Sequence, residues 1–309
     1  MTETKQRGNI TPPPPRTFAD ITFRGWALET DVVKRLLKAL PSSVRENLQS
    51  CYLDGDIESR EAEQVLDYLC DHSAITRIIR KNPGSSLAFE YLYRKEEPES
   101  PIDCYYLESL AGCHVEKRLA TLERNLPGWL KPLCRENPVL VDNMGSGPGH
   151  DMVHVLKTTP ELAGHFHVRN IDSDEEALQI GQATVDALGF SDHFAFCCSD
   201  FRKVPPRQAD VILLIGILCS LPMDIHIRLL RQMKPFCRPG GLIFSSTNQV
   251  AMVEKDPFTD FLMRLAGWRM DYKTNAEVAE AAVRAGWEYE RQFFDDDLHF
   301  QCITVARCP

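Results

Sequence analysis

Three glycines follow a short apolar run near the middle of the chain. Residues 139–151 read VLVDNMGSGPGHD, so Gly145, Gly147 and Gly149 stand at alternate positions after the run. Glycine adopts backbone conformations that other residues avoid, and it lets a ligand approach the main chain closely. In α/β proteins, an apolar strand followed by a glycine-rich turn and a helix brings main-chain N–H groups to a nucleotide-like ligand. We therefore expect such a ligand at this turn.

Two aspartates follow later apolar runs in the same way. Asp172 ends the run HVRNID at residues 167–172, and Asp200 follows HFAFCC at residues 193–198. Alone, each is typical of a strand end or a turn. Together, behind successive strands, they stand at the edge of the sheet where ligands bind in open α/β folds.

Two common nucleotide motifs do not fit the glycine turn. The dinucleotide fingerprint G-x-G-x-x-G would begin at Gly145 and Gly147, but its third glycine position holds His150. A P-loop requires Gly-Lys-Ser/Thr after its loop, and the sequence has none there. The turn therefore favours neither NAD nor ATP.

The remaining motifs resemble, in order, those of the class I S-adenosylmethionine (SAM)-dependent methyltransferases. They are G-x-G-x-G after the first strand, Asp172, Asp200, and KPFCRPGG at residues 234–241 before the fifth strand. The resemblance covers about residues 139–307 and implies SAM as the cosubstrate. It also implies an α/β fold with a Rossmann-like, doubly wound, mostly parallel seven-stranded sheet whose last strand is antiparallel.

The resemblance also implies which residues bind the cofactor. The glycine loop approaches the methionine arm and the ribose, Asp172 accepts from the ribose hydroxyls, and Asp200 accepts from the adenine amine. Ser173 is more simply the cap of the following helix. Phe201 is expected to pack against the adenine, and Ile215 and Gly216 to lie beneath the sulfonium. The full set of expected cofactor-binding residues is Asn143, Gly145, Ser146, Gly147, Gly149, Asp172, Ser173, Asp200, Phe201, Ile215 and Gly216.

One position departs from the family pattern. An acidic residue normally stands two positions before the first motif glycine, near the amino group of SAM, and here that position holds Asn143. Asp142, one residue earlier, should point to the other face of the strand, because successive side chains alternate. An amide can accept a hydrogen bond from an ammonium group, but it attracts the charge less strongly than a carboxylate.

The sequence indicates no obvious catalytic base. After the fourth strand, where many small-molecule methyltransferases place a base, the chain has Cys219 and Ser220, which are poor bases without a partner and would also suit a packed turn. Tyr91, Tyr93 and Tyr106 are expected either to pack between helices or to face the sulfonium, since an aromatic face attracts a cation by about 0.5 to 2 kcal/mol. These tyrosines and Ser220 are the catalytic candidates.

Two further groups of polar residues have simpler interpretations. His150 and His154 stand four residues apart, a spacing that metal sites use, but no third ligand is indicated and no metal is expected. Residues 295–297, three consecutive aspartates, are expected to form a solvated turn between the last two strands.

Two reactions of SAM fit these motifs. In the first, the protein places a small-molecule nucleophile in line with the methyl group and releases S-adenosylhomocysteine (SAH). In the alternative, the aminocarboxypropyl arm is attacked, by cyclisation to azetidine-2-carboxylate or by transfer to a nucleophile, and methylthioadenosine is released. Asn143 motivates the alternative, because that chemistry requires a neutral, mobile amine. A third interpretation, a binding scaffold without activity, conflicts with the intact glycines and with Asp172 and Asp200.

The elements that position these residues divide the chain into three parts. Residues 1–17 include four consecutive prolines and are expected to form a disordered tail. Residues 18–135 have apolar residues at helical spacing and are expected to form an all-α cap or lid domain. Residues 136–309 alternate strands and helices, which predicts a parallel sheet covered on both faces and thus the SAM-binding domain. The cap and the segment 256–268 are where we expect the acceptor pocket.

The boundaries of several elements are also predicted. Capping boxes at Ser173–Glu176 and Thr274–Glu277 predict two helix starts. Strands are expected at residues 139–141, 167–172, 193–198, 210–218, 241–246 and 300–306, with one more beginning at Trp287.

Composition restricts the partners and the location. The chain has 44 acidic and 35 basic residues, so its surface field disfavours nucleic acid and a small-molecule substrate is expected. No apolar stretch is long enough for a membrane span and the N-terminus lacks a signal-peptide core, so we expect a cytoplasmic protein. The eleven cysteines show no C-x-x-C spacing and are expected to be reduced. The helical region also suits a homodimer arm.

Overall fold

A single sheet forms the centre of the C-terminal half of the protein. The computed structural model describes residues 27–94, 97–134, 138–295 and 299–309, and the tail expected at residues 1–17 lies outside them. Seven strands pair in the order β3-β2-β1-β4-β5-β7-β6. β7 runs in the direction opposite to the other six strands, which confirms the predicted fold class. The strands are β1 (Val139–Met144), β2 (Phe166–Asp172), β3 (Phe194–Cys198), β4 (Ala209–Leu214), β5 (Cys237–Asn248), β6 (Glu288–Phe294) and β7 (Gln301–Arg307).

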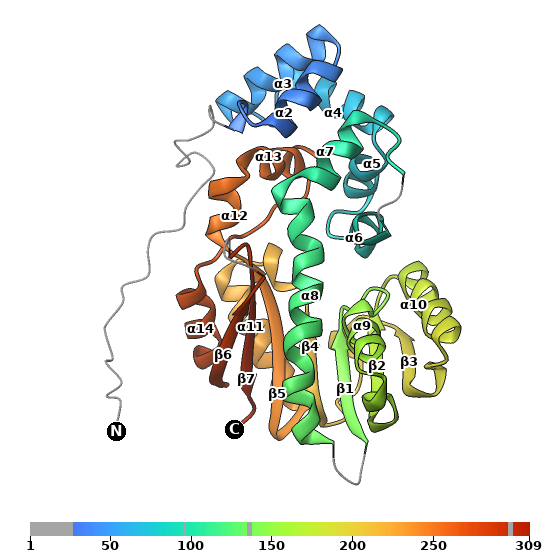
Figure 1. Cartoon of the computed structure of the whole chain (residues 1–309). Coiled ribbons are helices and arrows are strands. Elements are labelled where there is room, and N and C mark those ends of the chain that lie inside the picture. Colours follow the sequence, from blue (N-terminus) through green and yellow to red (C-terminus); the bar gives the residue numbers. More distant parts are fainter. Residues whose placement is uncertain (1–26, 95–96, 135–137, 296–298) are drawn as a thin grey trace.

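Alternating side chains of the central strands fill two apolar cores, one on each face of the sheet. In β4, Val211 and Leu213 belong to one core, whereas Ile212 and Leu214 belong to the other. The first core also contains residues of α8, α9 and α10, and the second contains residues of α11 and α14 (Figure 1). These helices are α8 (Leu110–Leu130), α9 (His150–Thr158), α10 (Glu175–Leu188), α11 (Met223–Met233) and α14 (Asn275–Arg284).

A third apolar core holds the helical region together above the carboxyl edge of the sheet (Figure 1). It combines N-terminal helices with residues that follow β5, including Phe258, Phe261 and Trp268. The 21-residue helix α8 descends from this region along the sheet. The other helices here are α2 (Asp31–Ala39), α3 (Ser42–Asp54), α4 (Arg60–His72), α5 (Ala74–Lys81), α6 (Ser86–Arg94), α7 (Pro101–Glu108), α12 (Val250–Lys255) and α13 (Pro257–Leu265).

Three predicted details can be compared with the structure. The capping box at Thr274 and Glu277 is confirmed. The prediction at Ser173 is wrong by one residue, because the N-cap of α10 is Asp174 and its side chain accepts from the Ala177 amide. The fourth strand was also predicted too long: β4 ends at Leu214, since Gly216 has a φ of +81° and turns the chain.

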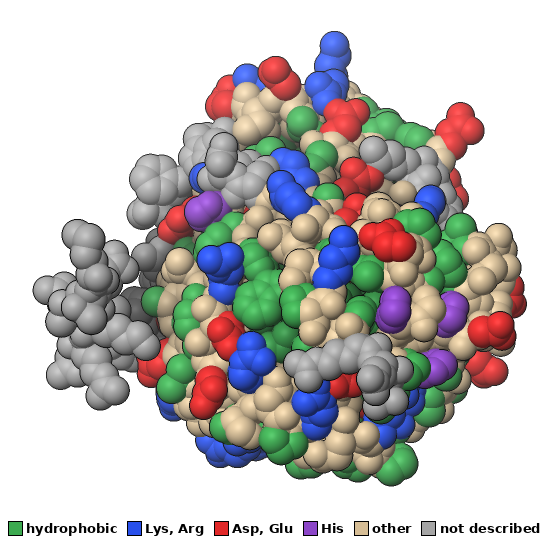
Figure 2. Space-filling model, turned by 60° about the horizontal axis from the view of Figure 1, so that its bottom comes forward, with side chains coloured by type: hydrophobic (Ala, Val, Ile, Leu, Met, Phe, Trp, Pro, Cys, Tyr) green, Lys and Arg blue, Asp and Glu red, His purple; other side chains and the backbone are tan. Residues whose placement is uncertain are grey.

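The surface in Figure 2 carries acidic and basic side chains interspersed with apolar ones. Among the described residues, no helix has the length and apolar character needed to cross a membrane.

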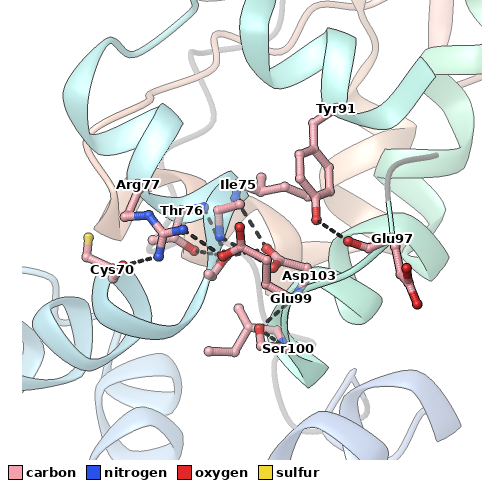
Figure 3. Close-up of polar contacts among 12 residues, drawn as sticks. Cys70, Ile75, Thr76, Arg77, Tyr91, Glu97, Glu99, Ser100 and Asp103 are labelled. Atoms are coloured by element: carbon pink, nitrogen blue, oxygen red, sulfur yellow. Dashed lines mark hydrogen bonds and ion pairs between the residues drawn. The ribbon is translucent and has the colours of Figure 1, made fainter. Parts of the chain in front are cut away.

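A buried carboxylate fixes the start of α5 within the helical region. Asp103 of α7 is fully buried, and its oxygens accept from the Ser73 hydroxyl at 2.7 Å and from the amides of Ala74 and Ile75 at 3.3 and 3.2 Å (Figure 3). The first amides of a helix have no partner within the helix. Asp103 therefore caps α5 from a different helix and joins α5 to α7.

Replacement of Asp103 should destabilise the helical region. The substitution Asp103→Ala leaves buried amides without an acceptor and should lower the free energy of unfolding by about 2 to 4 kcal/mol. Urea unfolding followed by circular dichroism measures the change. Asp71→Ala, at an exposed position, is the control and should change it by less than about 0.5 kcal/mol. Equal stability of the two variants would contradict the capping role.

A second buried polar group lies behind the sheet. His226 of α11 is fully buried, and neither ring nitrogen has a hydrogen-bond partner among the described residues. Burial, followed by the charge of Lys273, lowers the pKa of His226 to about 3. The imidazole is therefore neutral in the folded protein.

The buried imidazole should make stability depend on pH. Its folded-state pKa lies below its ordinary value of 6.5, so the unfolded chain binds the proton more readily and stability falls as the pH falls through 6.5. Between pH 7 and pH 5 the loss from this group is about 2 kcal/mol. His226→Leu should remove the roughly 2 kcal/mol of stability loss that comes from this imidazole. Urea unfolding at pH 7 and pH 5 measures the free energy of unfolding. If the change in stability between the two pH values is the same in His226→Leu as in the wild-type protein, His226 is not its source.

Candidate functional site

A cavity of about 830 Å³ lies at the carboxyl ends of β1 to β4. Its floor is formed by the segments that follow these four strands, at residues 145–148, 172–174, 199–202 and 215–217. Its roof is formed by residues 82–93, which include part of α6, and by Arg118 of α8. The cavity therefore lies between the sheet and the helical region, at the edge where open α/β sheets bind ligands.

The glycine loop after β1 forms one wall of the cavity. Gly145, Gly147 and Gly149 have positive φ values of 62°, 52° and 78°, so the loop conformation disfavours other residues. A Cβ atom at Gly147 would lie 2.7 Å from Ser86 Cβ of α6. The roof thus packs directly on the loop.

Asp172 holds the glycine loop at the end of β2. Its Oδ2 accepts from the Gly147 amide at 2.7 Å, and its Oδ1 accepts from the Asp174 amide at 2.9 Å. Each carboxylate oxygen has a second lone pair, so Asp172 can still accept from a ligand's hydroxyl groups. Ser173 lines the same part of the cavity.

Asp200 and Phe201 line the cavity after β3. Arg202 binds both oxygens of Asp200 through Nε at 2.9 Å and Nη2 at 2.8 Å. Hydrogen bonds from Arg202 lower the pKa of Asp200 to about 2. The carboxylate is therefore ionised, and a ligand amine that binds there must share it with Arg202.

The segment after β4 completes the floor. Ile215 and Gly216 line the cavity, and the Gly216 amide donates to Ser246 Oγ at 2.8 Å. This bond fixes the turn to β5. Gly216 also lies close to the roof, since a Cβ atom there would be 3.5 Å from Arg118 Nη1.

Two expected cofactor residues do not line the cavity. Asn143 is fully buried, and its Nδ2 donates to Asn170 Oδ1 at 3.1 Å. Gly149 packs against the same asparagine, because a Cβ atom there would lie 2.4 Å from Asn170 Nδ2. Asp142 faces away from them and pairs with Arg169 and Arg207. Asn143 and Gly149 therefore lie behind the glycine loop and pack against Asn170.

Of the four catalytic candidates, Tyr93 alone is among the residues lining the 830 Å³ cavity. Its hydroxyl accepts from Arg118 Nη2 at 3.0 Å, and burial raises the pKa of Tyr93 above its usual range. Tyr91 is buried in the helical core, with its hydroxyl directed toward the Glu97 carbonyl (Figure 3). Tyr106 is buried and lines a separate, smaller cavity, and Ser220 is exposed. The positions of Tyr91 and Ser220 offer no contact with a ligand in the main cavity.

Four cavity residues carry chemistry that the sequence did not single out as a site. Glu90 of α6 pairs with His150 Nε2, and this pair joins the roof to the first residue of α9. Asp151, the next residue, is buried and lines the cavity, and burial raises its pKa. Arg118 is buried in the roof. Only His150 and Asp151 adjoin a motif, so the sequence contains no signal that would have indicated Glu90 or Arg118.

His150, His154 and Asp295 have partners within the protein. His150 pairs with Glu90 and His154 with Glu123, and no cluster of three or more metal-binding side chains occurs in the part of the chain that the structure describes. The expectation of a solvated turn is wrong at Asp295, which is buried and pairs with His114 of α8. Residues 296–297 of that turn lie outside the described residues.

The charge of the cavity favours a cationic ligand. Five carboxylates line it, against three arginines. They are Glu90, Asp151, Asp172, Asp174 and Asp200, and the arginines are Arg118, Arg202 and Arg228.

Comparison with solved structures identifies the fold. A possible exported protein from Bordetella parapertussis has a TM-score of 0.67 at 17% identity, over 91% of this chain and 98% of that chain. Magnesium protoporphyrin IX methyltransferase from Synechocystis PCC 6803, solved with bound SAH, has a TM-score of 0.55 at 13% identity, over 76% and 100%. Mitomycin 7-O-methyltransferase has a TM-score of 0.51 at 16% identity, over 96% and 74%. No family model and no curated protein matches the chain.

These neighbours and the strand order define the class of fold. The chain has the fold of the class I SAM-dependent methyltransferases, with a mixed seven-stranded sheet and a mostly helical N-terminal region. The glycine loop and Asp172 stand in this fold where their motifs predicted, facing one cavity.

A side chain at position 147 should disturb the contact between loop and roof. Gly147→Ala places a Cβ at positive φ and against Ser86, so the free energy of unfolding should fall by about 1 to 3 kcal/mol. The control is Gly128→Ala in α8, where nothing lies within 4 Å of an added Cβ and stability should stay equal or rise by up to about 1 kcal/mol. Urea unfolding compares the two, and a Gly147→Ala protein as stable as wild type would contradict the packing described.

Proposed function

We propose that the protein is a SAM-dependent methyltransferase that acts on a small molecule. The observation that carries the proposal is the convergence of the glycine loop, Asp172 and Asp200 on one cavity between the sheet and the helical region. The solved neighbour with bound SAH supports it. SAM supplies a methyl group activated by the positive charge of a sulfonium.

The residues of the cavity fit the parts of SAM. Gly145 and Gly147 expose main chain without a side chain to the cavity, which suits close approach of the methionine arm. Asp172 accepts from the ribose hydroxyls, while Asp200 and Phe201 bind the adenine. Asp151 lies buried at the cavity wall beside the loop, and we assign it the attraction of the ammonium group that an acid at position 143 would otherwise provide.

The cavity walls do the catalytic work by positioning. The roof excludes water and holds an acceptor next to the sulfonium, and such placement is the main requirement of methyl transfer. A base is needed only when the nucleophile arrives protonated. For such a nucleophile, the pair of Glu90 and His150 is the acid–base group of the cavity wall.

The alternative reaction on the aminocarboxypropyl arm is motivated by one observation. Asn143, which occupies the usual position of the acid, is buried against Asn170 and does not reach the cavity. Asp151 offers a carboxylate instead, and we therefore favour methyl transfer.

Removal of the Asp172 carboxylate should weaken binding of the nucleoside. By isothermal titration calorimetry, Asp172→Ala should bind SAH about 10- to 100-fold more weakly, because a hydrogen bond to a charged group contributes about 1.5 to 3 kcal/mol. Asp224→Ala, at an exposed position of α11 outside the cavity, is the control and should bind SAH as wild type does. Absence of SAH binding by the wild-type protein would refute the proposal.

The product distinguishes the two reactions. The wild-type protein is incubated with SAM alone and with SAM plus a pool of small molecules. The nucleoside products are separated by liquid chromatography and identified by mass spectrometry. Methyl transfer predicts SAH only when an acceptor is present. Methylthioadenosine formed from SAM alone would establish the alternative.

A further inference from the structure

A second, smaller cavity adjoins the main one. Its volume is about 50 Å³, and Phe89 and Arg118 line both cavities. We call it the side cavity. Its lining is almost entirely apolar and comes from the helical region and the segment after β5, as in Leu92, Met252 and Met263. No part of SAM has an apolar group that would occupy it.

The side cavity has buried donors with no acceptor. Arg118 Nε and Trp268 Nε1 are both buried, and neither has a hydrogen-bond partner among the described residues. Both residues line the side cavity, as do Tyr106 and Gln301, whose hydroxyl and Oε1 also have no hydrogen-bond partner among the described residues. More than nine in ten buried polar groups in proteins are hydrogen-bonded. Two such donors beside one cavity therefore point to a ligand that supplies acceptors.

Arg118 is a buried cation. It is 7% exposed, its Nη2 donates to Tyr93 at 3.0 Å, and its guanidinium lies 5.2 Å from the centre of the Phe89 ring. Within the described residues no carboxylate forms an ion pair with it. Burial opposes its charge, but Tyr93 and Asp151 outweigh that effect and raise the pKa of Arg118. A buried guanidinium of this kind is the usual partner of a ligand carboxylate.

The volume of the side cavity limits the apolar group that fits. A protein cavity of about 150 Å³ holds one benzene molecule. The side cavity has about a third of that volume. It therefore suits a short branched alkyl group of a few carbon atoms better than an aromatic ring.

We propose that the acceptor is a small aliphatic carboxylic acid whose alkyl end fills the side cavity and whose carboxylate binds Arg118. The inference rests on the proposed function, because the acceptor must lie beside SAM in the main cavity. Phe89 and Arg118 line both cavities. The acid would therefore extend from the side cavity into the main cavity.

Binding of probe acids to the SAH-saturated protein tests the proposal by calorimetry. The probes are isovalerate, its neutral amide isovaleramide, and acetate, which lacks the alkyl end. Isovalerate should bind at least 10-fold more tightly than either of the others. Equal binding of isovalerate and isovaleramide, or binding of none of the probes, would overturn the proposal.

Two kinds of variant identify the site. Arg118→Met should remove the preference for isovalerate over its amide, whereas Arg124→Met, at an exposed position of the same helix, should keep it. Ala88→Leu and Ala111→Leu add side-chain volume at two apolar positions of the side cavity. At least one of them should fold, as judged by thermal unfolding, and bind isovalerate at least 10-fold more weakly with unchanged SAH affinity. Unchanged isovalerate affinity in a folded variant would refute the assignment of the side cavity.

A further experiment tests whether Arg118 binds the carboxylate of the acceptor or the carboxylate of SAM. Arg118→Met should bind SAH and methylthioadenosine, which lacks the amino-acid arm, as tightly as wild type. A loss of 10-fold or more for SAH alone would assign Arg118 to the cosubstrate and overturn the acceptor proposal. This outcome leaves the proposed function intact, whereas failure of the wild-type protein to bind SAH would refute the function itself.

Discussion

The hydrogen bond from the Gly147 amide to Asp172 Oδ2 joins the loop after β1 to the end of β2. A bond to a charged acceptor is stronger than one between neutral groups, so the two strand ends keep a fixed distance. Two more loop amides, at Gly145 and Ser146, donate to the Ile171 carbonyl and hold the same geometry. The absence of a side chain at position 147 lets Ser86 rest on this loop. The floor and the roof of the cavity therefore meet directly at Gly147.

The two sides of the cavity differ in chemistry. The sheet contributes Asp172 and Asp200, which suit the hydroxyl and amino groups of a nucleoside. The helical region contributes aromatic rings and the buried cation of Arg118. Because Arg118 is buried, little solvent screens its charge. In our proposal the sheet side binds the nucleoside, and the helical side determines which second substrate is accepted.

The sequence predicted the sheet, and it predicted that the glycine turn and the acids at the strand ends lie together, because these features depend on local patterns of apolar strands and turns. It placed the start of α10 one residue too early, because Ser173 and Asp174 can both act as an N-cap and the structure uses Asp174. It also failed where distant contacts decide. Tyr91 and Tyr93 are two residues apart on a helix and so point in different directions, and only the tertiary structure shows that Tyr93 is the one that lines the cavity. Arg118 lies in a helix without any motif, and its importance in our proposal comes from a buried Nε that has no hydrogen-bond partner among the described residues, which no sequence pattern reveals.

Helix α8 belongs to two hydrophobic cores at once. Near its start, Ala111 packs with the helical region, whereas Leu122, Leu126 and Leu130 near its end pack against the sheet. A fragment beginning at β1 would expose the part of that face that α8 covers and would be prone to association. The two regions are therefore not interchangeable modules. An evolutionary exchange of the helical region for another one would have to keep the second half of α8, so new substrate preferences in such a chain would arise more readily by substitution within the existing roof than by recombination.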